Sequence, residues 1–556
     1  MMHVLIRKPL CQLFFFVIIA LITYSTLILL PGLYGDDPVF LYSTLKLGPG
    51  GIERALGWSR PYSTWLFRLV IPLISTRLWL YQLITVCLRG LCAWLLSLVL
   101  VKANPRWGMP AFWTGILFIV YPGFTVQSHA LNFMVHFFAL LCYLLSVWLM
   151  LRAVDEASRW LALVFTLVSM IISLSIFMVE YFTGLELLRL VFLWMAYKRM
   201  DNERAFRYAV SRWLPYLGVF AFYLYWRLVM FLPAYPRVSL ASEFQTNPLG
   251  VFTFLAERIG IDFWKSTILA WGNLLEIRAM VNQRFLWLGM GIILAALLAV
   301  FFLKRNDFEA KDIKSALGFI LFGLIAFLAG GLPLWASGTP LEITFPWTRA
   351  TLCVLAGISI TAAGLLALLP RKSGIVALSF LTGLSMSFQI YLGLDFRCDW
   401  DHLRGIFQQL VEKAPGLKPG TMVLFEDLSI RYYSGNSLTP LLNWIYDPEA
   451  VGDGDWYRAF EISERLGSLL PALEPGIAVR HGGFTGTTSQ TIVITLDADG
   501  QLMILEPGSP LPPGASSLLT DAWRISNPGE VIDFSAPDAE LPDFMLEERT
   551  SKKFYD

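Results

Sequence analysis

The chain has 556 residues, of which 56% are hydrophobic and only 15% are charged. Soluble domains carry roughly a quarter charged residues, so this composition excludes a soluble globule and predicts a polytopic membrane protein. The net charge of +1 hides a division, because residues 395–556 hold 12 Lys and Arg against 25 Asp and Glu, whereas residues 1–394 hold 31 against 17. A basic first part and an acidic last part indicate two compartments.

The first apolar run, residues 12–30, follows Arg7 and Lys8 and lacks a small-residue cleavage pattern. We therefore expect an uncleaved first span rather than a signal peptide. Apolar runs of similar character recur along the chain and predict an α-helical protein with about eleven spans. The expected spans are residues 12–30, 78–101, 109–121, 130–151, 160–179, 185–196, 213–232, 285–303, 316–328, 351–369 and 375–394.

The turns that are rich in Lys and Arg fall on the side of the N-terminus, and the turn at residues 198–212 is the most basic of them. The positive-inside rule then places the N-terminus in the cytoplasm. An odd number of spans places the loops at residues 31–77 and 233–283, and the C-terminal region, on the outer face. Residues 63–74 within the first outer loop predict a helix that lies in the membrane interface.

The composition changes after residue 394, so we expect a transmembrane domain at 1–394, a small α+β domain at 395–526 and a loose acidic tail at 527–556. Residues 400–414 predict a helix. Residues 421–425, 477–480, 491–496 and 501–505 predict strands. The turn at 497–500 resembles the start of a calcium loop, but it lacks the later ligands and predicts a hairpin instead.

An acidic pair, Asp36 and Asp37, directly follows the first span. Carboxylates at the edge of a membrane domain are costly, so their first interpretation is functional. The alternative is a solvated loop with a turn at Asp37-Pro38.

Other polar side chains share the predicted outer face, and each has a structural alternative. His129 is the type of residue that packs within a span wall, Glu180 can end a helix, and Arg60 can anchor an interface. Arg349 opens a span at its outer end, against the positive-inside bias. The candidate substrate-binding residues are Arg60, Gln127, His129, Glu180 and Arg349.

This combination of groups suits sugar transfer from a polyprenyl-phosphate donor. A carboxylate can act as general base toward an acceptor hydroxyl, and an arginine can hold the phosphate that leaves. Carboxylates also stabilise the oxocarbenium-like state at the anomeric carbon.

The first span, the acidic pair in the first outer loop, the interfacial helix and the outer tail resemble the GT-C class of membrane glycosyltransferases. That class includes protein O-mannosyltransferases, lipid A aminoarabinose transferases and O-antigen glucosyltransferases. The resemblance implies a catalytic role for Asp36 or Asp37, without choosing between them, and a donor-phosphate role for Arg349. The Arg60-Pro61 step is similar to a basic-Pro step of some bacterial relatives. Some members of the class need a divalent metal ion, so the metal requirement stays open.

The resemblance further implies a multi-pass protein of an inner or plasma membrane, with a lipid-linked sugar as donor, a lipid, glycan or protein as acceptor, and no nucleic acid partner. Two other functions remain open. A transporter or lipid flippase would need charges deep in the spans, for which Arg89, Glu186 and Arg189 are the candidates. A non-catalytic scaffold of envelope assembly would use the acidic tail as a docking surface.

Overall fold

The computed structural model forms two compact units, and each is described by itself. The helical unit comprises Met1–Leu29, Gln82–Gln127 and Phe133–Gly393, and the sheet unit comprises Leu30–Tyr81, Ser128–Asn132 and Leu394–Asp556. The structure describes residues 8–48, 50–200, 203–231, 247–274, 284–303, 312–426, 428–449, 456–463, 466, 473–508, 511, 515–535 and 539–546. Parts of the predicted outer loop 233–283 and of the predicted tail therefore lie outside the described residues.

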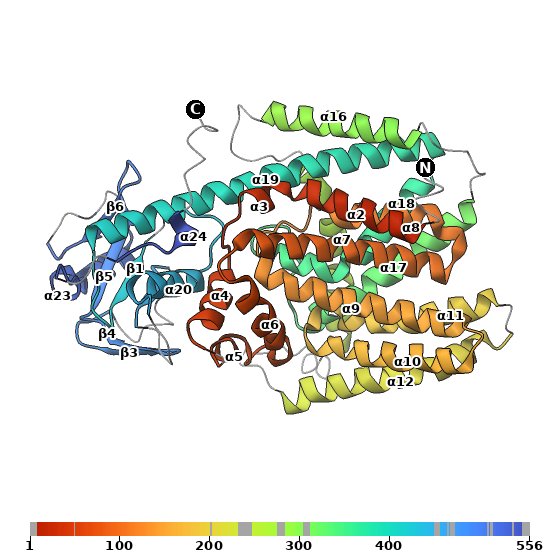
Figure 1. Ribbon diagram of the computed structural model, residues 1–556, viewed down its shortest axis with the longest axis horizontal. Helices are drawn as coiled ribbons and strands as arrows, with labels where there is room; N and C mark the ends of the chain where they lie inside the picture. The colour runs from red at the N-terminus through yellow and green to blue at the C-terminus, as the bar shows by residue number, and fades with distance from the viewer. Residues whose placement is uncertain are drawn as a thin grey trace. The chain divides into compact units, whose positions relative to one another are not determined.

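Each of the eleven apolar runs predicted to span a membrane is helical (Figure 1). Their helices are α2 (Pro9–Thr23) with α3 (Ser25–Leu29), α7 (Leu78–Ala103), α8 (Gly108–Val120), α9 (Ala130–Asp155), α10 (Arg159–Ser173), α11 (Leu188–Arg199), α12 (Ala205–Tyr225), α16 (Arg284–Leu303), α17 (Ile313–Ala336), α18 (Thr351–Ala367) and α19 (Arg371–Lys413). Within the described residues, 7 helices are long and apolar enough to cross a membrane. The chain is a multi-pass α-helical membrane protein, and eleven as the number of spans stays a prediction.

The helix boundaries and helix types differ from the predicted spans at several places. The first span is divided at Tyr24, whose hydroxyl donates to the Ile119 carbonyl at 2.8 Å. A 3-10 helix, η4 (Glu180–Leu187), takes the first turns of the span predicted at 185–196 and leaves α11 only 12 residues. A π-helical turn, Trp226–Met230, extends α12. Shorter 3-10 helices lie at Pro105–Trp107, Leu174–Phe177 and Trp347–Ala350.

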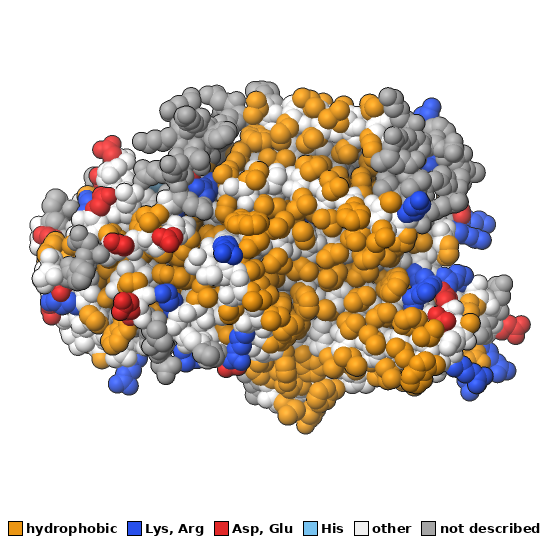
Figure 2. Space-filling model, viewed as in Figure 1, with side chains coloured by type: hydrophobic (Ala, Val, Ile, Leu, Met, Phe, Trp, Pro, Cys, Tyr) orange, Lys and Arg blue, Asp and Glu red, His pale blue; other side chains and the backbone are white. Residues whose placement is uncertain are grey.

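The surface of the helical unit is apolar over wide areas, as Figure 2 shows. In the apolar windows of α10 and α16, only 17% and 22% of the residues are buried. Exposed side chains on these helices include Trp160, Leu167, Ile171, Ile293 and Leu297. Lipid tails are the solvent that stabilises such faces, since water would disfavour this much exposed apolar area.

Three turns predicted to share one side of the membrane meet at one end of the helical unit. Asp155, at the end of α9, forms ion pairs with Lys102 of α7 and Arg199 of α11, each at 2.5 Å. Arg199 also donates to the Lys102 carbonyl. The ends of α7, α9 and α11 therefore lie together, as the alternation of the predicted spans requires.

The C-terminal part of the sheet unit contains a four-stranded mixed sheet with the order β2-β1-β5-β6, and a separate hairpin formed by β3 and β4. Strands β2 and β5 pair in parallel with β1, and β5 pairs antiparallel with β6 across the predicted turn at 497–500. The strands are β1 (Met422–Phe425), β2 (Arg458–Glu461), β3 (Ala478–His481), β4 (Phe484–Thr487), β5 (Thr491–Leu496) and β6 (Leu502–Leu505). The four predicted strands are confirmed, whereas β2 and β4 were not predicted.

Two features of this region differ from the expectation. The helix predicted at 400–414 is the end of α19, which runs without a break from Arg371 to Lys413. Beyond Asn527 the chain was expected to be loose, but α23 (Pro528–Val531) and α24 (Asp543–Leu546) are formed. The backbone of this segment bonds to residues that follow α19, through Asp533 N to the Gly416 carbonyl at 3.0 Å and Lys418 N to the Val531 carbonyl at 2.9 Å.

The first loop forms helices α4 (Asp37–Leu45), α5 (Gly51–Leu56) and α6 (Thr64–Ile74), with a 3-10 turn at Pro61–Ser63. Helix α6 confirms the helix predicted at 63–74, and one of its faces exposes Trp65, Leu69 and Leu73. Helix α4 packs against α20 (Gly435–Tyr446), where the Tyr42 and Trp444 rings lie 5.9 Å apart. A further helix, α22 (Ser517–Arg524), covers the sheet core through Leu519 and Ala522.

Candidate functional site

The acidic pair does not lie in a solvated turn, because it starts a helix. Asp36 is the N-cap of α4, Asp37 is its first residue, and Pro38 occupies the first turn, where its missing N–H leaves no bond unmade. Gly35 precedes the pair with φ +55°, in the left-handed region, and a Cβ at this position would clash with the His129 ring. Glycine is therefore required at this approach, and it brings His129 directly beside the acidic loop.

Asp37 is 1% exposed, and both of its carboxylate oxygens are bonded. Its Oδ1 accepts the Asn132 backbone N–H at 3.0 Å, and its Oδ2 accepts the Leu131 N–H at 3.2 Å. These donors belong to the first turn of α9, so the carboxylate caps a second helix N-terminus. Burial raises the pKa of Asp37 well above its ordinary value, and the backbone donors oppose that rise.

Asp36 is half-buried and has a different environment. Its Oδ1 accepts the Ser434 hydroxyl at 3.1 Å, and no partner for its Oδ2 lies among the described residues. Neither Asp36 nor Asp37 forms an ion pair within the described part of the chain. The two neighbours thus separate into a carboxylate whose oxygens are both bonded and a carboxylate with one oxygen available.

The other candidates of the sheet unit are His129 and Arg60. The His129 side chain is buried, and its ring meets Phe396 edge-on with centroids 6.4 Å apart. Arg60 is half-buried and precedes the 3-10 turn at Pro61–Ser63, where its carbonyl accepts the Ser63 hydroxyl at 2.7 Å. The structure brings His129 to the acidic loop, where its ring lies against Gly35.

Gln127 belongs to the helical unit and is 1% exposed. Its Oε1 accepts Arg89 Nη1 at 2.9 Å, and Arg89 Nη2 donates to the Phe118 carbonyl at 3.1 Å. The Arg89 guanidinium also lies over the rings of Tyr24 and Phe124 at 5.0 and 5.1 Å. This arginine, which the sequence marked only as a mid-span charge, fixes the side chain of a predicted site residue.

Arg349 and Glu180 also belong to the helical unit, and both are half-buried. Arg349 lies on the 3-10 turn Trp347–Ala350, with its guanidinium 5.0 Å from the centre of the Trp347 ring. The neighbouring Thr348 hydroxyl is 3.0 Å from that of Thr125, so the loop before Gln127 and the turn that carries Arg349 are joined. Glu180 is the first residue of η4.

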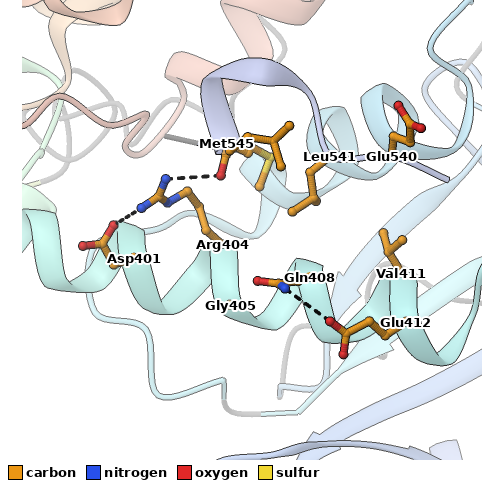
Figure 3. A pocket seen from close by; sticks show the side chains of 10 residues that line it. Asp401, Arg404, Gly405, Gln408, Val411, Glu412, Glu540, Leu541 and Met545 are labelled. Carbon is orange, nitrogen blue, oxygen red and sulfur yellow. Dashed lines mark hydrogen bonds and ion pairs between the residues drawn. The ribbon is translucent and has the colours of Figure 1, made fainter. Parts of the chain in front are cut away.

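A cavity of about 570 Å³ lies elsewhere in the sheet unit, between the last turns of α19 and the C-terminal segment (Figure 3). Asp401 and Arg404 line it, and Glu412 and Glu540 add two further carboxylates. Arg404 bonds to Asp401 and to the Met545 carbonyl, so its charge is used to hold α24 in place. Asp36 and Asp37 do not line this cavity.

Metal binding is constrained by the donors at hand. Among the residues that the structure describes, no group of three or more His, Cys, Asp or Glu side chains is arranged to hold a metal ion. At the acidic loop, Asp37 has both oxygens engaged by backbone amides. The Asp36 carboxylate of this loop can accept a proton.

Ser434 was not a candidate in the sequence, and Arg89 was a candidate only for transport. Ser434 meets Asp36 across 398 residues of chain, and no spacing pattern signals such a contact. A buried arginine inside a span was visible as an exception in an apolar run, but its partner was not.

No family model matches the sequence. No curated protein matches it. Among solved structures, the chain is similar to the crystal structure of ArnT from Cupriavidus metallidurans in the apo state, with a TM-score of 0.33, 13% sequence identity, and coverage of 88% of this chain and 93% of that chain. A superposition at this TM-score leaves the function to be inferred from the side chains of the chain itself.

Proposed function

We propose that the chain is a membrane glycosyltransferase that moves a sugar from a polyprenyl-phosphate donor to an acceptor hydroxyl on the outer face, with Asp36 as the general base. The observation that carries this proposal is the half-buried Asp36 carboxylate, which has one oxygen fixed by Ser434 and the other available. A general base needs an unoccupied oxygen within hydrogen-bond reach of the proton that it accepts. Asp37 is the weaker candidate, because it is 1% exposed and each of its oxygens already accepts a backbone N–H.

In the proposed reaction the acceptor hydroxyl gives its proton to Asp36 Oδ2 while its oxygen forms a bond to the anomeric carbon. The bond between that carbon and the phosphate oxygen breaks, and the phosphate leaves with the electron pair. An arginine fork suits the doubly charged product, and Arg349 is the donor-phosphate candidate, with Arg60 as a second cation from the first loop. Gln127, His129 and Glu180 are the remaining candidates for substrate contacts.

The charges within the helical unit disfavour the alternative of a proton-coupled transporter. Glu186 and Arg189 bond to each other, with Arg189 Nη2 at 3.0 Å from Glu186 Oε1, and Arg189 Nη1 donates to Ser146 at 3.0 Å. Arg89 is held by Gln127, a carbonyl and aromatic rings. These side chains form closed local contacts instead of the chain of titratable groups that a proton-coupled transporter uses.

The test is Asp36→Asn in the full-length protein, reconstituted in lipid with polyprenyl-phosphate sugars that carry a radiolabel in the sugar. The acceptor is an envelope extract, and the measurement is loss of label from the lipid fraction. Removal of a general base lowers the rate by roughly 10²–10⁴-fold. Asp499→Asn, at an exposed residue in the turn between β5 and β6 of the same unit, is the matched control and should transfer at the wild-type rate. Full transfer by Asp36→Asn would exclude Asp36 as the base.

A further inference from the structure

A short segment of the C-terminal region, residues 431–434, lies against the acidic loop. The Gly35 N–H donates to the Tyr432 carbonyl at 3.4 Å, and Gly35 pairs with Tyr433 as an isolated parallel bridge. The Ser434 hydroxyl is 3.1 Å from Asp36 Oδ1 and 3.4 Å from the Gly35 carbonyl. The carboxylate is the stronger of the two acceptors, because a hydrogen bond to an ionised group is roughly twice as strong as one between neutral groups.

Two carboxylates of α19 also accept hydrogen bonds from this segment. Asp399 accepts the backbone N–H groups of Arg431 and Tyr432 at 2.9 and 2.7 Å. Asp395 accepts the Tyr432 hydroxyl at 2.6 Å. The Tyr432 ring also packs on Phe396, with ring centroids 3.9 Å apart. Asp395, Phe396 and Asp399 lie within about one turn of α19, so a rigid helix fixes the segment that contacts Asp36.

We propose that residues 431–434 are a positioning element of the acidic loop and that Ser434 is a positioning residue for the Asp36 carboxylate. The inference rests on the proposed function. Ser434 gives its single hydroxyl proton to Oδ1, which directs Oδ2 away from Ser434 and toward the acceptor. The acidic C-terminal region thereby contributes to the reaction, because its Ser434 side chain orients the Asp36 carboxylate. A misplaced base lowers the rate of the chemical step without weakening the binding of a donor held elsewhere.

Ser434 is also the N-cap of α20, and its backbone N–H donates to the Ser437 hydroxyl at 3.2 Å. A capping role and a positioning role must therefore be separated. Ser434→Thr keeps the hydroxyl and the cap, whereas Ser434→Ala loses both. Ser434→Asp keeps a good N-cap acceptor but has no proton to donate, and it places a second carboxylate against Asp36.

The experiment measures kcat and KM for the labelled polyprenyl-phosphate sugars with these three variants in lipid, together with their melting temperatures. Positioning predicts a kcat within about twofold of wild type for Ser434→Thr and a loss of about tenfold for Ser434→Ala, with an unchanged KM for the donor. Ser434→Asp should lose at least as much kcat as Ser434→Ala, although it retains the cap of α20. Capping alone predicts instead that Ser434→Asp keeps the wild-type kcat.

A second pair of variants tests the support behind Ser434. Tyr432→Phe removes the bond to Asp395 and keeps the ring on Phe396, and we expect a several-fold lower kcat. Tyr446→Phe is the matched control, because the Tyr446 hydroxyl of the same unit donates to the Ala414 carbonyl at 2.8 Å, away from Asp36. Equal kcat values for the two variants and wild type would overturn the role of the 431–434 segment.

The two proposals fail in different ways. If Asp36→Asn abolishes transfer and both Ser434→Ala and Ser434→Asp transfer at the wild-type rate, the positioning role is wrong and the proposed function stands. If Asp36→Asn transfers at the wild-type rate, the proposed base is wrong, whatever the Ser434 variants do.

Discussion

Glu186 of the helical unit and Asp37 of the sheet unit are both almost fully buried, but different donors satisfy their carboxylates. Glu186 faces the Arg189 guanidinium, which also lies over the Tyr143 and Tyr216 rings at 5.1 and 4.8 Å. Asp37 has no cationic partner among the described residues and is held by two backbone amides of α9. The ion pair is closed on itself, whereas Asp37 joins two chain segments and leaves its neighbour Asp36 available.

The two units therefore stabilise a buried carboxylate in different ways. A buried ion pair surrounded by aromatic rings is static and costly to break, but it offers no free group for chemistry. A carboxylate that accepts N–H groups of a helix N-terminus fixes the backbone around it. The neighbouring Asp36 keeps one carboxylate oxygen without a partner among the described residues. The following substitutions test this contrast between the two carboxylates.

The largest effect on stability is expected from Glu186→Gln. The change leaves the fully buried Arg189 without its anion, and breaking a buried pair on one side costs about 3–5 kcal/mol. The apparent melting temperature in detergent, followed by tryptophan fluorescence, measures the loss. The double variant Glu186→Leu/Arg189→Met is the control, and it should recover most of the stability. A double variant as unstable as the single one would contradict the closed-pair interpretation.

A smaller loss is expected from Asp37→Asn. The amide keeps one acceptor oxygen but turns an N–H₂ group toward the second backbone donor, which costs about 1–3 kcal/mol. Melting temperature again measures the loss, and transfer should fall less than with Asp36→Asn because Asp36, the proposed base, is retained. A transfer rate lower than that of Asp36→Asn would exchange the roles of the two acids.

The same variant predicts a change in pH dependence. Because the folded chain raises the pKa of Asp37, it binds this proton more tightly than the unfolded chain does. The contribution of Asp37 to stability is therefore greatest below the ordinary carboxyl pKa of about 4 and falls as the pH rises from there toward the raised pKa. Melting temperatures recorded at increasing pH should converge between wild type and Asp37→Asn across this window. A difference that grows with pH would show that the backbone donors outweigh burial.

The smallest effect is expected from Arg68→Gln. The Arg68–Glu53 ion pair of the first loop is 2.6 Å long, but its side chains are 39% and 53% exposed. Exposed ion pairs contribute about 0–1 kcal/mol, so the melting temperature should change little. A loss as large as that of Glu186→Gln would show that this loop is buried in the working protein.

The helices followed from the sequence because hydropathy is a local property, and each predicted apolar run is helical. Strands β5 and β6 followed for a similar reason, since alternation and the turn at 497–500 are local signals. Helix α20 was missed because Gly435 and Pro440 read as helix breakers, and β2 was missed because its four residues show no alternation. Its parallel pairing with β1 depends on residues distant in the chain.

For the candidate site as well, the local features were predicted from the sequence and the tertiary contacts were not. The acidic pair and its position after the first span were visible in the sequence, but the choice between Asp36 and Asp37 was not. Asp37 is distinguished by amides 94 and 95 residues away, and Asp36 by a hydroxyl 398 residues away. Adjacent residues of one type have the same local pattern, so only tertiary contacts can give them different roles.

The sheet unit is built from three separate segments of the chain, which matters for any attempt to express the acidic region by itself. A fragment cut at residue 395 would begin in the middle of α19 and lack the segments Leu30–Tyr81 and Ser128–Asn132. It would lose the Pro31 carbonyl that Arg397 binds at 3.0 Å, and it would bare the Trp444 face that α4 covers. Residues 395–556 are therefore not an independent domain, and an expressed fragment needs the segments Leu30–Tyr81 and Ser128–Asn132 to complete its fold.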